Sequence, residues 1–319
     1  MASQIVEITD RDSGSTARVL PSLGFNCFSW RPVVGDGPRE MLWAGAGFEA
    51  GDKRPSSGGI PLLFPFPGRI GAAKYKFEGR EYHLESGDAF GNAIHGFVLN
   101  QPWRVVEQQA ARVVGEFQAS VDDPAILERW PADFRIRVAY EVRGRELVSE
   151  IRYENTGDGP LPCGFGTHPY FRLPLAEGGS VADTVVTVPA EAFWELEKMN
   201  PTGRILSVPE KQNLTNGLRL GDREFDTVFT KLRADADGQV RTRLADPTTG
   251  RVLTQSFDSA FTQCVVYTPP HREAICIEPY TCVPDAIRLA AEGHNTGLQV
   301  LRPGEKHQTT VRIEVEEGN

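Results

Sequence analysis

Residues 134–157 read FRIRVAYEVRGRELVSEIRYENTG, and this stretch decides the fold class. Apolar side chains occupy every second position across 134–142, with arginine, alanine or glutamate between them. After Gly144 the alternation resumes and continues to Tyr153. A period of two places the apolar side chains on one face of an extended chain. The stretch therefore predicts two antiparallel strands, joined by a short turn, with one buried face.

Strand patterns recur along most of the chain, whereas helical periodicity is weak. The 32 glycines and 23 prolines separate the apolar runs at short intervals, as all-β chains require. Only DDPAILERWPADF (122–134) and PDAIRLAAEG (284–293) predict short helices. No internal repeat or linker marks a boundary, so we expect one β-sandwich-like domain over residues 1–319. The further strand candidates are ARVVGEFQASV, TVVTVPA, QCVVYTP, AICIEPY, LQVLRPG and QTTVRIEVEE.

Composition narrows the functional class. The 319 residues carry a net charge of −9, which disfavours nucleic acid or anionic membrane as a partner. No apolar run approaches the length of a membrane span, and the first residues lack the pattern of a secretory signal. Five cysteines without a CxxC motif predict free thiols in a reducing compartment. We therefore expect a cytoplasmic protein.

Five polar residues stand in stretches rich in glycine, proline and aromatic residues. Each has a structural interpretation, such as a packed histidine, a capping carboxylate or an ion-paired arginine. Burying one such group costs several kcal/mol unless it is paired, and five together favour a functional site. The stretches are GGIPLLFPFPGRI with Arg69, GNAIHGFVLNQPWRV with His95, GTHPYFRLP with His168, REFDTVFT with Asp226 and CIEPYTCVPDAI with Glu278.

Two histidines and a carboxylate raise three chemical possibilities: a metal site, nucleophilic catalysis and acid–base catalysis. A metal site of His95, His168 and Glu278 is one, although the local pairs HxH and HExxH are absent. A nucleophile is unsupported, because the chain has no G-x-S-x-G motif. The third is metal-free acid–base catalysis, in which a glutamate kept ionised by neighbouring positive charge takes a proton and a histidine gives one.

A sugar would suit such a site. Asp226 and Arg69 could bind hydroxyls, and Pro169 would fix His168 in an extended conformation. Flat aromatic rings could support the apolar face of the sugar ring. The aromatic candidates are Phe97, Trp103, Tyr170, Phe171 and Trp194.

The motifs FPGRI, NAIHGF, THPYF, FDTVF and IEPYT, in this order, resemble those of the aldose 1-epimerases, or mutarotases. That family implies a large twisted antiparallel β-sandwich, the galactose mutarotase-like supersandwich, without cofactor or metal. It implies interconversion of the α and β anomers of a hexose, with Glu278 as general base and His168 as general acid. His95 would orient the sugar, and Arg69, Asp226, Phe97 and Tyr170 would bind it. We expect a small sugar as the partner of a monomer or homodimer.

Two departures from the family pattern leave the sugar open. The first histidine is followed by HGFVLNQPW instead of an HGG-type segment, and THPYF replaces a pattern closer to NHTYF. A related branch acts on hexose 6-phosphates, for which Arg172, Arg69 and Lys74 are candidate phosphate ligands. A non-catalytic carbohydrate-binding protein with the same cleft is the other alternative.

Overall fold

The computed structural model of the protein describes residues 5–35 and 37–316. The predicted hairpin is confirmed as β13 (Phe134–Arg143) and β14 (Glu146–Asn155), which pair antiparallel along their full length. Gly144 in the turn has φ 59°, a left-handed conformation that glycine adopts without steric cost. The apolar side chains of β13 are at most 1% exposed, so the predicted face is buried.

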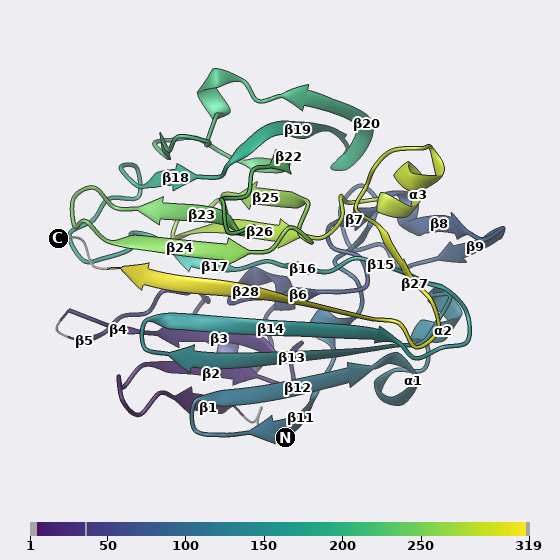
Figure 1. Ribbon diagram of the computed structural model, residues 1–319, viewed down its shortest axis with the longest axis horizontal. Helices are drawn as coiled ribbons and strands as arrows, with labels where there is room; N and C mark the ends of the chain where they lie inside the picture. The colour runs from purple at the N-terminus through teal and green to yellow at the C-terminus, as the bar shows by residue number, and fades with distance from the viewer. Residues whose placement is uncertain (1–4, 36, 317–319) are drawn as a thin grey trace.

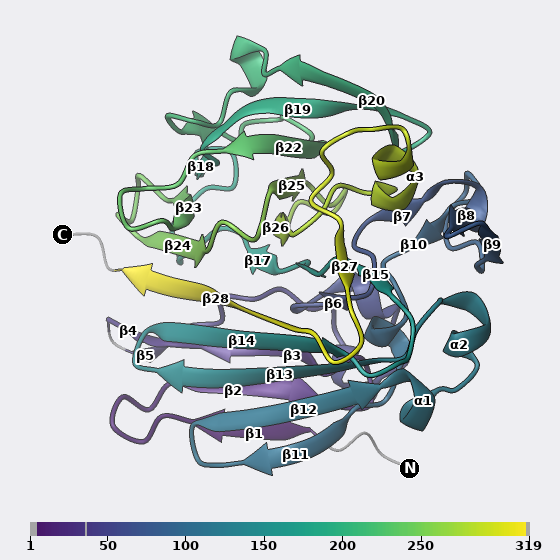
Figure 2. The same ribbon diagram turned by 45° about the vertical axis from the view of Figure 1, so that its right-hand side comes forward.

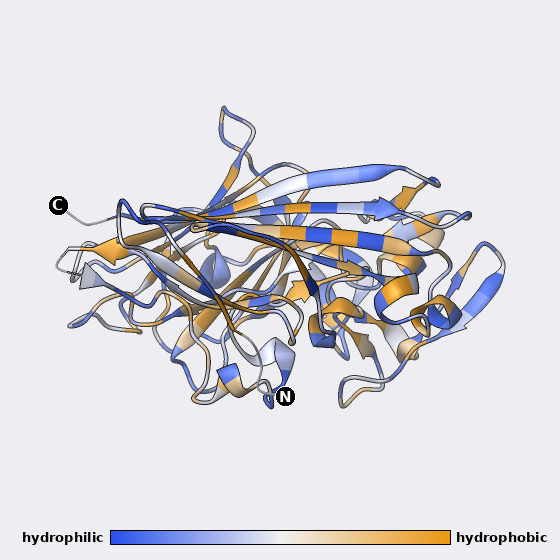
Figure 3. Cartoon of the chain, turned by 90° about the horizontal axis from the view of Figure 1, so that it is seen from below, coloured by the Kyte–Doolittle hydropathy of each residue, from blue (hydrophilic) through white to orange (hydrophobic). Residues whose placement is uncertain are grey.

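A nine-stranded antiparallel sheet extends from this hairpin (Figure 1). Blue and orange bands alternate along its long strands in Figure 3, as the period of two requires. Most of the other stretches predicted to be strands form strands of this sheet or of the second large sheet. The last of them, QTTVRIEVEE, ends at Glu317, which lies outside the described residues. In spatial order the strands are β11 (Arg104–Gln108), β12 (Arg112–Gln118), β13, β14, β28 (Lys306–Glu316), β24 (Val252–Phe257), β23 (Val240–Ala245), β18 (Val185–Thr187) and β21 (Leu218–Arg219).

A second large sheet has eight strands and carries the centre of the candidate site (Figure 2). Its strands come from distant parts of the chain. Their order is β20 (Asn200–Ser207), β19 (Ala190–Glu197), β22 (Asp226–Leu232), β25 (Gln263–Tyr267), β26 (Ala274–Tyr280), β16 (Gly166–Thr167) and β6 (Leu62–Leu63), with β17 (Tyr170–Arg172) also paired to β26.

Smaller elements complete the fold. The helices α2 (Ile126–Arg129) and α3 (Ala286–Ala291) confirm the two predicted helical stretches. A further helix, α1 (Ala119–Asp122), occupies the end of ARVVGEFQASV, so the strand predicted there ends at Gln118. None of the helices within the described residues is long and apolar enough to cross a membrane. The small sheets are β1 (Val6–Thr9) with β2 (Thr16–Leu20) and β3 (Asn26–Arg31), β4 (Val33–Val34) with β5 (Gly37–Pro38), β7 (Arg69–Ile70) with β10 (Ala93–Ile94), β8 (Lys74–Phe77) with β9 (Arg80–His83), and β15 (Leu161–Cys163) with β27 (Gln299–Leu301). The single-turn 3₁₀ segments are η1 (Phe48–Ala50), η2 (Pro55–Ser57), η3 (Gly71–Ala73), η4 (Val98–Asn100) and η5 (Glu210–Gln212).

The main hydrophobic core draws side chains from nearly the whole chain, from Val6 to Val315. The central strand β26 is buried on both faces, but its two faces differ. Ile275 and Ile277 pack into the main core, whereas Cys276, Glu278 and Tyr280 point to the opposite face. All five cysteines are free and buried, as the sequence predicts. The protein is therefore an all-β antiparallel sandwich with a few short helices.

Candidate active site

Strand register brings the carboxylates of the site onto one face of the eight-stranded sheet. Glu278 on β26 lies opposite Val265 on β25. Two residues further along β25, Tyr267 lies opposite Asp226 on β22. Residues two positions apart on a strand share a face, as do directly opposed residues of antiparallel strands. Asp226, Tyr267 and Glu278 therefore point to the same side.

This face forms the floor of a cavity of about 190 Å³, which we call the first hollow. The loops that follow β6 and β10 close its other side. Of the seven residues predicted for the site, all but Phe97 line the first hollow. The six are Arg69, His95, His168, Tyr170, Asp226 and Glu278. The structure therefore brings these six side chains together around one cavity.

The His168 ring is held rigidly, as the Thr-His-Pro sequence predicts. Its backbone N–H donates to the carbonyl of Pro61 at 3.0 Å, which continues the pairing of β16 with β6. Its ring stacks on Tyr170, with centroids 4.9 Å apart and planes inclined by 4°. The Tyr170 hydroxyl in turn donates to the carbonyl of Ser56 at 2.7 Å. The pairing with β6 therefore sets the direction of the imidazole, and the stacking on Tyr170 fixes its ring plane.

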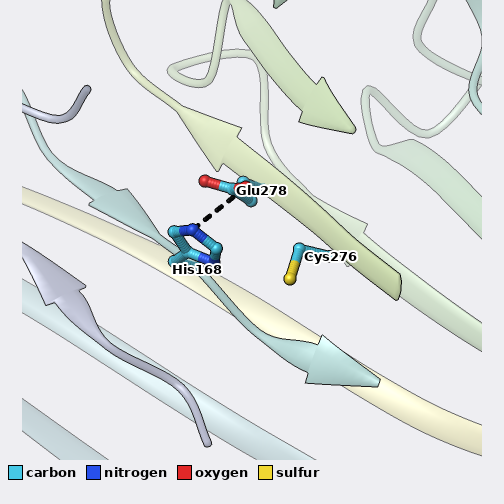
Figure 4. Close-up of side chains that lie close together, drawn as sticks. All are labelled: His168, Cys276 and Glu278. Atoms are coloured by element: carbon cyan, nitrogen blue, oxygen red, sulfur yellow. Dashed lines mark ion pairs between the residues drawn. The ribbon is translucent and has the colours of Figure 1, made fainter. Parts of the chain in front are cut away.

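His168 and Glu278 form a buried pair at the floor of the first hollow (Figure 4). Nε2 of His168 lies 3.3 Å from Oε1 of Glu278. The Tyr280 hydroxyl donates to Oε2 of Glu278 at 2.5 Å, so both carboxyl oxygens have partners. Glu278 is only 1% exposed. The pair is placed to exchange a proton internally or with a molecule in the hollow.

Burial is the largest influence on the pKa values of both residues of this pair. Burial raises the pKa of Glu278 well above its ordinary value, although the Tyr280 hydrogen bond and Arg69 oppose this shift. Burial lowers the pKa of His168 to about 3. Burial therefore favours the proton on Glu278 over the proton on His168. Arg69 lowers the pKa of Glu278, as the sequence analysis expects of a neighbouring positive charge, but burial is the larger effect and raises this pKa.

His95 reaches the first hollow through an unusual backbone turn. It has φ 66°, and its N–H donates to the carbonyl of Gly68 at 2.7 Å. Its ring meets that of His168 edge to face, with centroids 5.5 Å apart. Burial lowers the pKa of His95 well below its ordinary value, and His168 adds to this effect. His95 is therefore a neutral hydrogen-bonding group beside His168.

Gly96 makes the His95 turn possible, and substituting it is expected to destabilise the fold. Gly96 has φ 75°, and a Cβ there would lie 2.1 Å from the carbonyl oxygen of Phe64. Gly96→Ala should lower the free energy of unfolding by roughly 3 kcal/mol, from backbone strain and overpacking together. Gly91 is a matched control, because it has φ 82° but open space around the added Cβ. Gly91→Ala should cost only ~1 kcal/mol. Equal urea denaturation midpoints for the two variants would contradict this account.

Arg69 and Asp226 both line the first hollow. Nε of Arg69 donates to Oδ2 of Asp88 at 3.0 Å, and the side-chain amide of Asn92 donates to the same oxygen at 2.9 Å. Arg69 is thus positioned by a carboxylate that the sequence analysis did not single out. Asp226, the first residue of β22, is exposed at the mouth of the first hollow and can accept from hydroxyls there.

The aromatic predictions are only partly met. Tyr170 lines the first hollow, but Phe97 lies in a neighbouring cavity. Trp103, Phe171 and Trp194 are at most 5% exposed and belong to the packed interior. The prediction that these three support a sugar is wrong, because their rings complete the core instead.

Sequence reasoning missed several residues of the first hollow. Tyr280 lies within the IEPYT motif, and its position two residues after Glu278 could have placed it on the same face. Tyr267 and Arg54 carry no motif signal. Of the three predicted phosphate ligands only Arg69 lines the first hollow; Lys74 is exposed on β8, and Arg172 donates to the carbonyl of Leu42. A clamp of these three residues is therefore not formed.

The structure also changes the possible metal ligands. Among the described residues, ligand atoms of His168, Cys276 and Glu278 lie within 4.8 Å of one another (Figure 4). In this group the third candidate ligand is Cys276, whereas the sequence analysis named His95. The thiol is fully buried beside the acid–base pair, and its pKa is raised well above the ordinary value by burial.

Known proteins resemble this chain in sequence and in fold. The chain is 25% identical to the uncharacterised protein YihR of Escherichia coli K12, over 79% of this chain and 77% of that protein. It is 30% identical to galactose mutarotase of Mus musculus, over 44% of this chain but only 40% of that protein. A galactose mutarotase-like protein from Clostridium acetobutylicum has the same fold, with a TM-score of 0.86 and 22% identity over 99% of both chains.

The family comparison covers almost the whole chain. The sequence model of the family described as aldose 1-epimerase matches residues 7–314. Arg69, His95, His168, Asp226 and Glu278, the five polar residues that the sequence analysis singles out, fall within that range. The chain belongs to the aldose 1-epimerase family.

Proposed function

We propose that the protein is an isomerase that interconverts the α and β anomers of a hexose. The observation that carries the proposal is the buried pair of Glu278 and His168, 3.3 Å apart, in a cavity that His95, Arg69 and Asp226 also line. The five free thiols support assigning the protein to the cytoplasm. Opening a hexose ring requires one group that takes a proton and one that gives it, and this pair supplies both.

The proposed reaction uses two forms of the pair that hold the same number of protons. With the proton on His168, ionised Glu278 removes the proton from the hydroxyl on C1. The C1–O5 bond then breaks as C1 becomes a carbonyl, and His168 gives its proton to O5. The pair now has the proton on Glu278, which is the form favoured in the empty hollow. After rotation about C1–C2 the same transfers run backward and close the ring on the other face.

The direct test is exchange NMR of anomers. Purified protein added to glucose or galactose at equilibrium should increase the rate of α–β exchange above the spontaneous rate. A carbohydrate-binding protein would bind the sugar in calorimetry without accelerating exchange. A metal-dependent enzyme would contain stoichiometric metal and would lose exchange activity to a chelator. The first result would contradict the proposed function, and the second would contradict metal-free proton transfer by Glu278 and His168.

The pH dependence of the reaction follows from the pair's single proton. In acid the pair gains a second proton on His168, whose pKa is lowered to about 3, so the acid limb should lie well below the ordinary histidine pKa. In alkali the pair loses its proton from Glu278, whose pKa is raised, so that limb should lie above the ordinary glutamate pKa. We expect kcat/KM to be bell-shaped, with its maximum between these two limbs. An acid limb at or above the ordinary histidine value, after subtraction of the spontaneous rate, would contradict this.

A further inference from the structure

Strand register places His168, Cys276 and Glu278 on one face of the eight-stranded sheet. Strands β16 and β17 pair with β26 in one continuous register, in which Tyr170 lies opposite Cys276. Two residues before Tyr170, His168 falls opposite Glu278, which is two residues after Cys276 on β26. Opposed residues of antiparallel strands share a face, as do residues two apart on one strand. The three side chains therefore meet on a framework of paired strands (Figure 4).

The distances within this group suit a zinc ion. Ligand nitrogen and oxygen atoms lie ~2.0–2.2 Å from Zn²⁺ in a tetrahedral arrangement, which sets them about 3.3 Å apart. Nε2 of His168 and Oε1 of Glu278 are separated by 3.3 Å. The ligand atoms of all three residues lie within 4.8 Å of one another, so the Cys276 sulfur needs to approach by little more than ~1 Å. The Tyr280 hydroxyl donates to Oε2 of Glu278, which would orient the ligating carboxylate.

The charges of the group also suit a divalent cation. Zn²⁺ bound by a thiolate, a carboxylate and a neutral imidazole carries no net charge. Cys276 and Glu278 are at most 1% exposed, and a neutral complex avoids the large cost of burying an isolated charge. The ion itself ionises the thiol, because a thiol that coordinates a metal ion is deprotonated outright. Mg²⁺ prefers octahedral sites of oxygen ligands, so the sulfur and nitrogen donors disfavour it.

The first hollow gives an ion access to this group. His168 and Glu278 line the hollow, whereas Cys276 is completely buried beside them. An ion that enters the hollow would therefore meet the imidazole and the carboxylate, with the thiol as its third ligand from the protein. A zinc site with three protein ligands takes a water molecule in its fourth position, and the hollow can supply one.

We propose that His168, Cys276 and Glu278 form a Zn²⁺ site and that the bound ion inhibits anomer exchange. The inhibition rests on the proposed function, in which His168 and Glu278 carry the protons. A nitrogen lone pair or a carboxylate oxygen that is bound to Zn²⁺ cannot accept a proton at the same time. The occupied protein is therefore inactive, and removal of the ion restores exchange.

The test of the site measures metal binding to the purified protein without sugar. Co²⁺ should produce a thiolate-to-cobalt charge-transfer band in the near ultraviolet, and Zn²⁺ should abolish the band by displacing Co²⁺. Cys276→Ala should remove the band and weaken Zn²⁺ binding in calorimetry by ~100-fold or more, since even the loss of an outer-shell partner costs ~10–100-fold. Cys264→Ala is the matched control, because Cys264 is equally buried on the neighbouring β25 but packs in the main core. A band that survives Cys276→Ala, or no band with the unaltered protein, would overturn the site.

Exchange NMR of glucose tests the inhibition. At a Zn²⁺ concentration ~100 times Kd, exchange by the unaltered protein and by Cys264→Ala should fall about 100-fold, because only that fraction of the protein remains free. EDTA should restore exchange, and Mg²⁺ at the same concentration should leave it unchanged. Cys276→Ala, compared with its own rate without Zn²⁺, should slow by about twofold or less, as its weaker binding requires.

The outcomes separate the site from the proposed function. If no sugar exchanges above the spontaneous rate even with EDTA, the proposed function and the inhibition fail together, whereas the cobalt band still decides the site. If Zn²⁺ binds through Cys276 while exchange continues, the inhibition is wrong and Glu278 and His168 are not the proton-transfer groups. Exchange that requires Zn²⁺ would overturn both the inhibition and the metal-free reaction.

Discussion

Glu278→Gln is expected to lower kcat/KM for anomer exchange by about 10²–10⁴-fold, the usual contribution of a general acid or base. Glutamine has nearly the same shape, and its carbonyl oxygen can still accept the Tyr280 hydroxyl that contacts Glu278 at 2.5 Å. It cannot take up or release the proton that moves between O1 and O5. The loss should therefore appear in kcat, with sugar binding largely retained.

The measurement is exchange NMR at several enzyme concentrations, with the spontaneous rate subtracted. Glu191→Gln, an exposed carboxylate on β19, serves as a control and should leave kcat/KM unchanged. Melting temperatures of both variants show whether the fold is intact. A Glu278→Gln variant that keeps more than about a tenth of the activity would remove Glu278 from the reaction.

His168→Asn should produce a loss of similar size, because each turnover needs both proton transfers, one to Glu278 and one from His168. Asparagine cannot carry a proton to the ring oxygen, and it also loses the stacking on Tyr170 at 4.9 Å. A modest fall in stability is therefore expected beside the ~10²–10⁴-fold fall in kcat/KM. His83→Asn is the control, since the His83 side chain is 73% exposed on β9. A His168→Asn variant with near-normal exchange would show that another group donates the proton.

The double variant of Glu278→Gln and His168→Asn sharpens this test. Residues that act as one unit give strongly non-additive effects. We expect the double variant to be about as slow as the slower single variant. If the two losses multiply instead, the residues act independently and the shared-proton description is wrong.

The local sequence pattern was sufficient to predict most of the strands and to single out most of the candidate site residues. The alternation across 134–157 predicted the hairpin, because burying one face of a sheet requires a period of two. Glu278, His168 and His95 stood out as polar groups inside rigid apolar stretches. The order of strands in the sheets could not be predicted, since it depends on pairings such as β14 with β28 that the intervening sequence does not encode.

The errors in the site have related causes. Phe97 directly follows the His95 turn, yet its ring lies under Arg129 and lines the neighbouring cavity, because a two-residue offset in a loop does not fix a side chain's direction. Arg54 was missed because GDKRPSSGG has the composition of an ordinary surface turn. Trp103 and Trp194 illustrate the general tendency of large aromatic side chains to fill the core.

The walls of the first hollow come from chain segments that are far apart, between Arg69 on β7 and Glu278 on β26. Contacts between such distant segments form slowly in folding, because the entropy of closing a long loop is lost before the stabilising contacts form. Enzymatic turnover during refolding should thus return only with the last and slowest phase, after most of the circular dichroism signal has recovered. A truncated chain that ends before β26 should have strand content but no turnover at all.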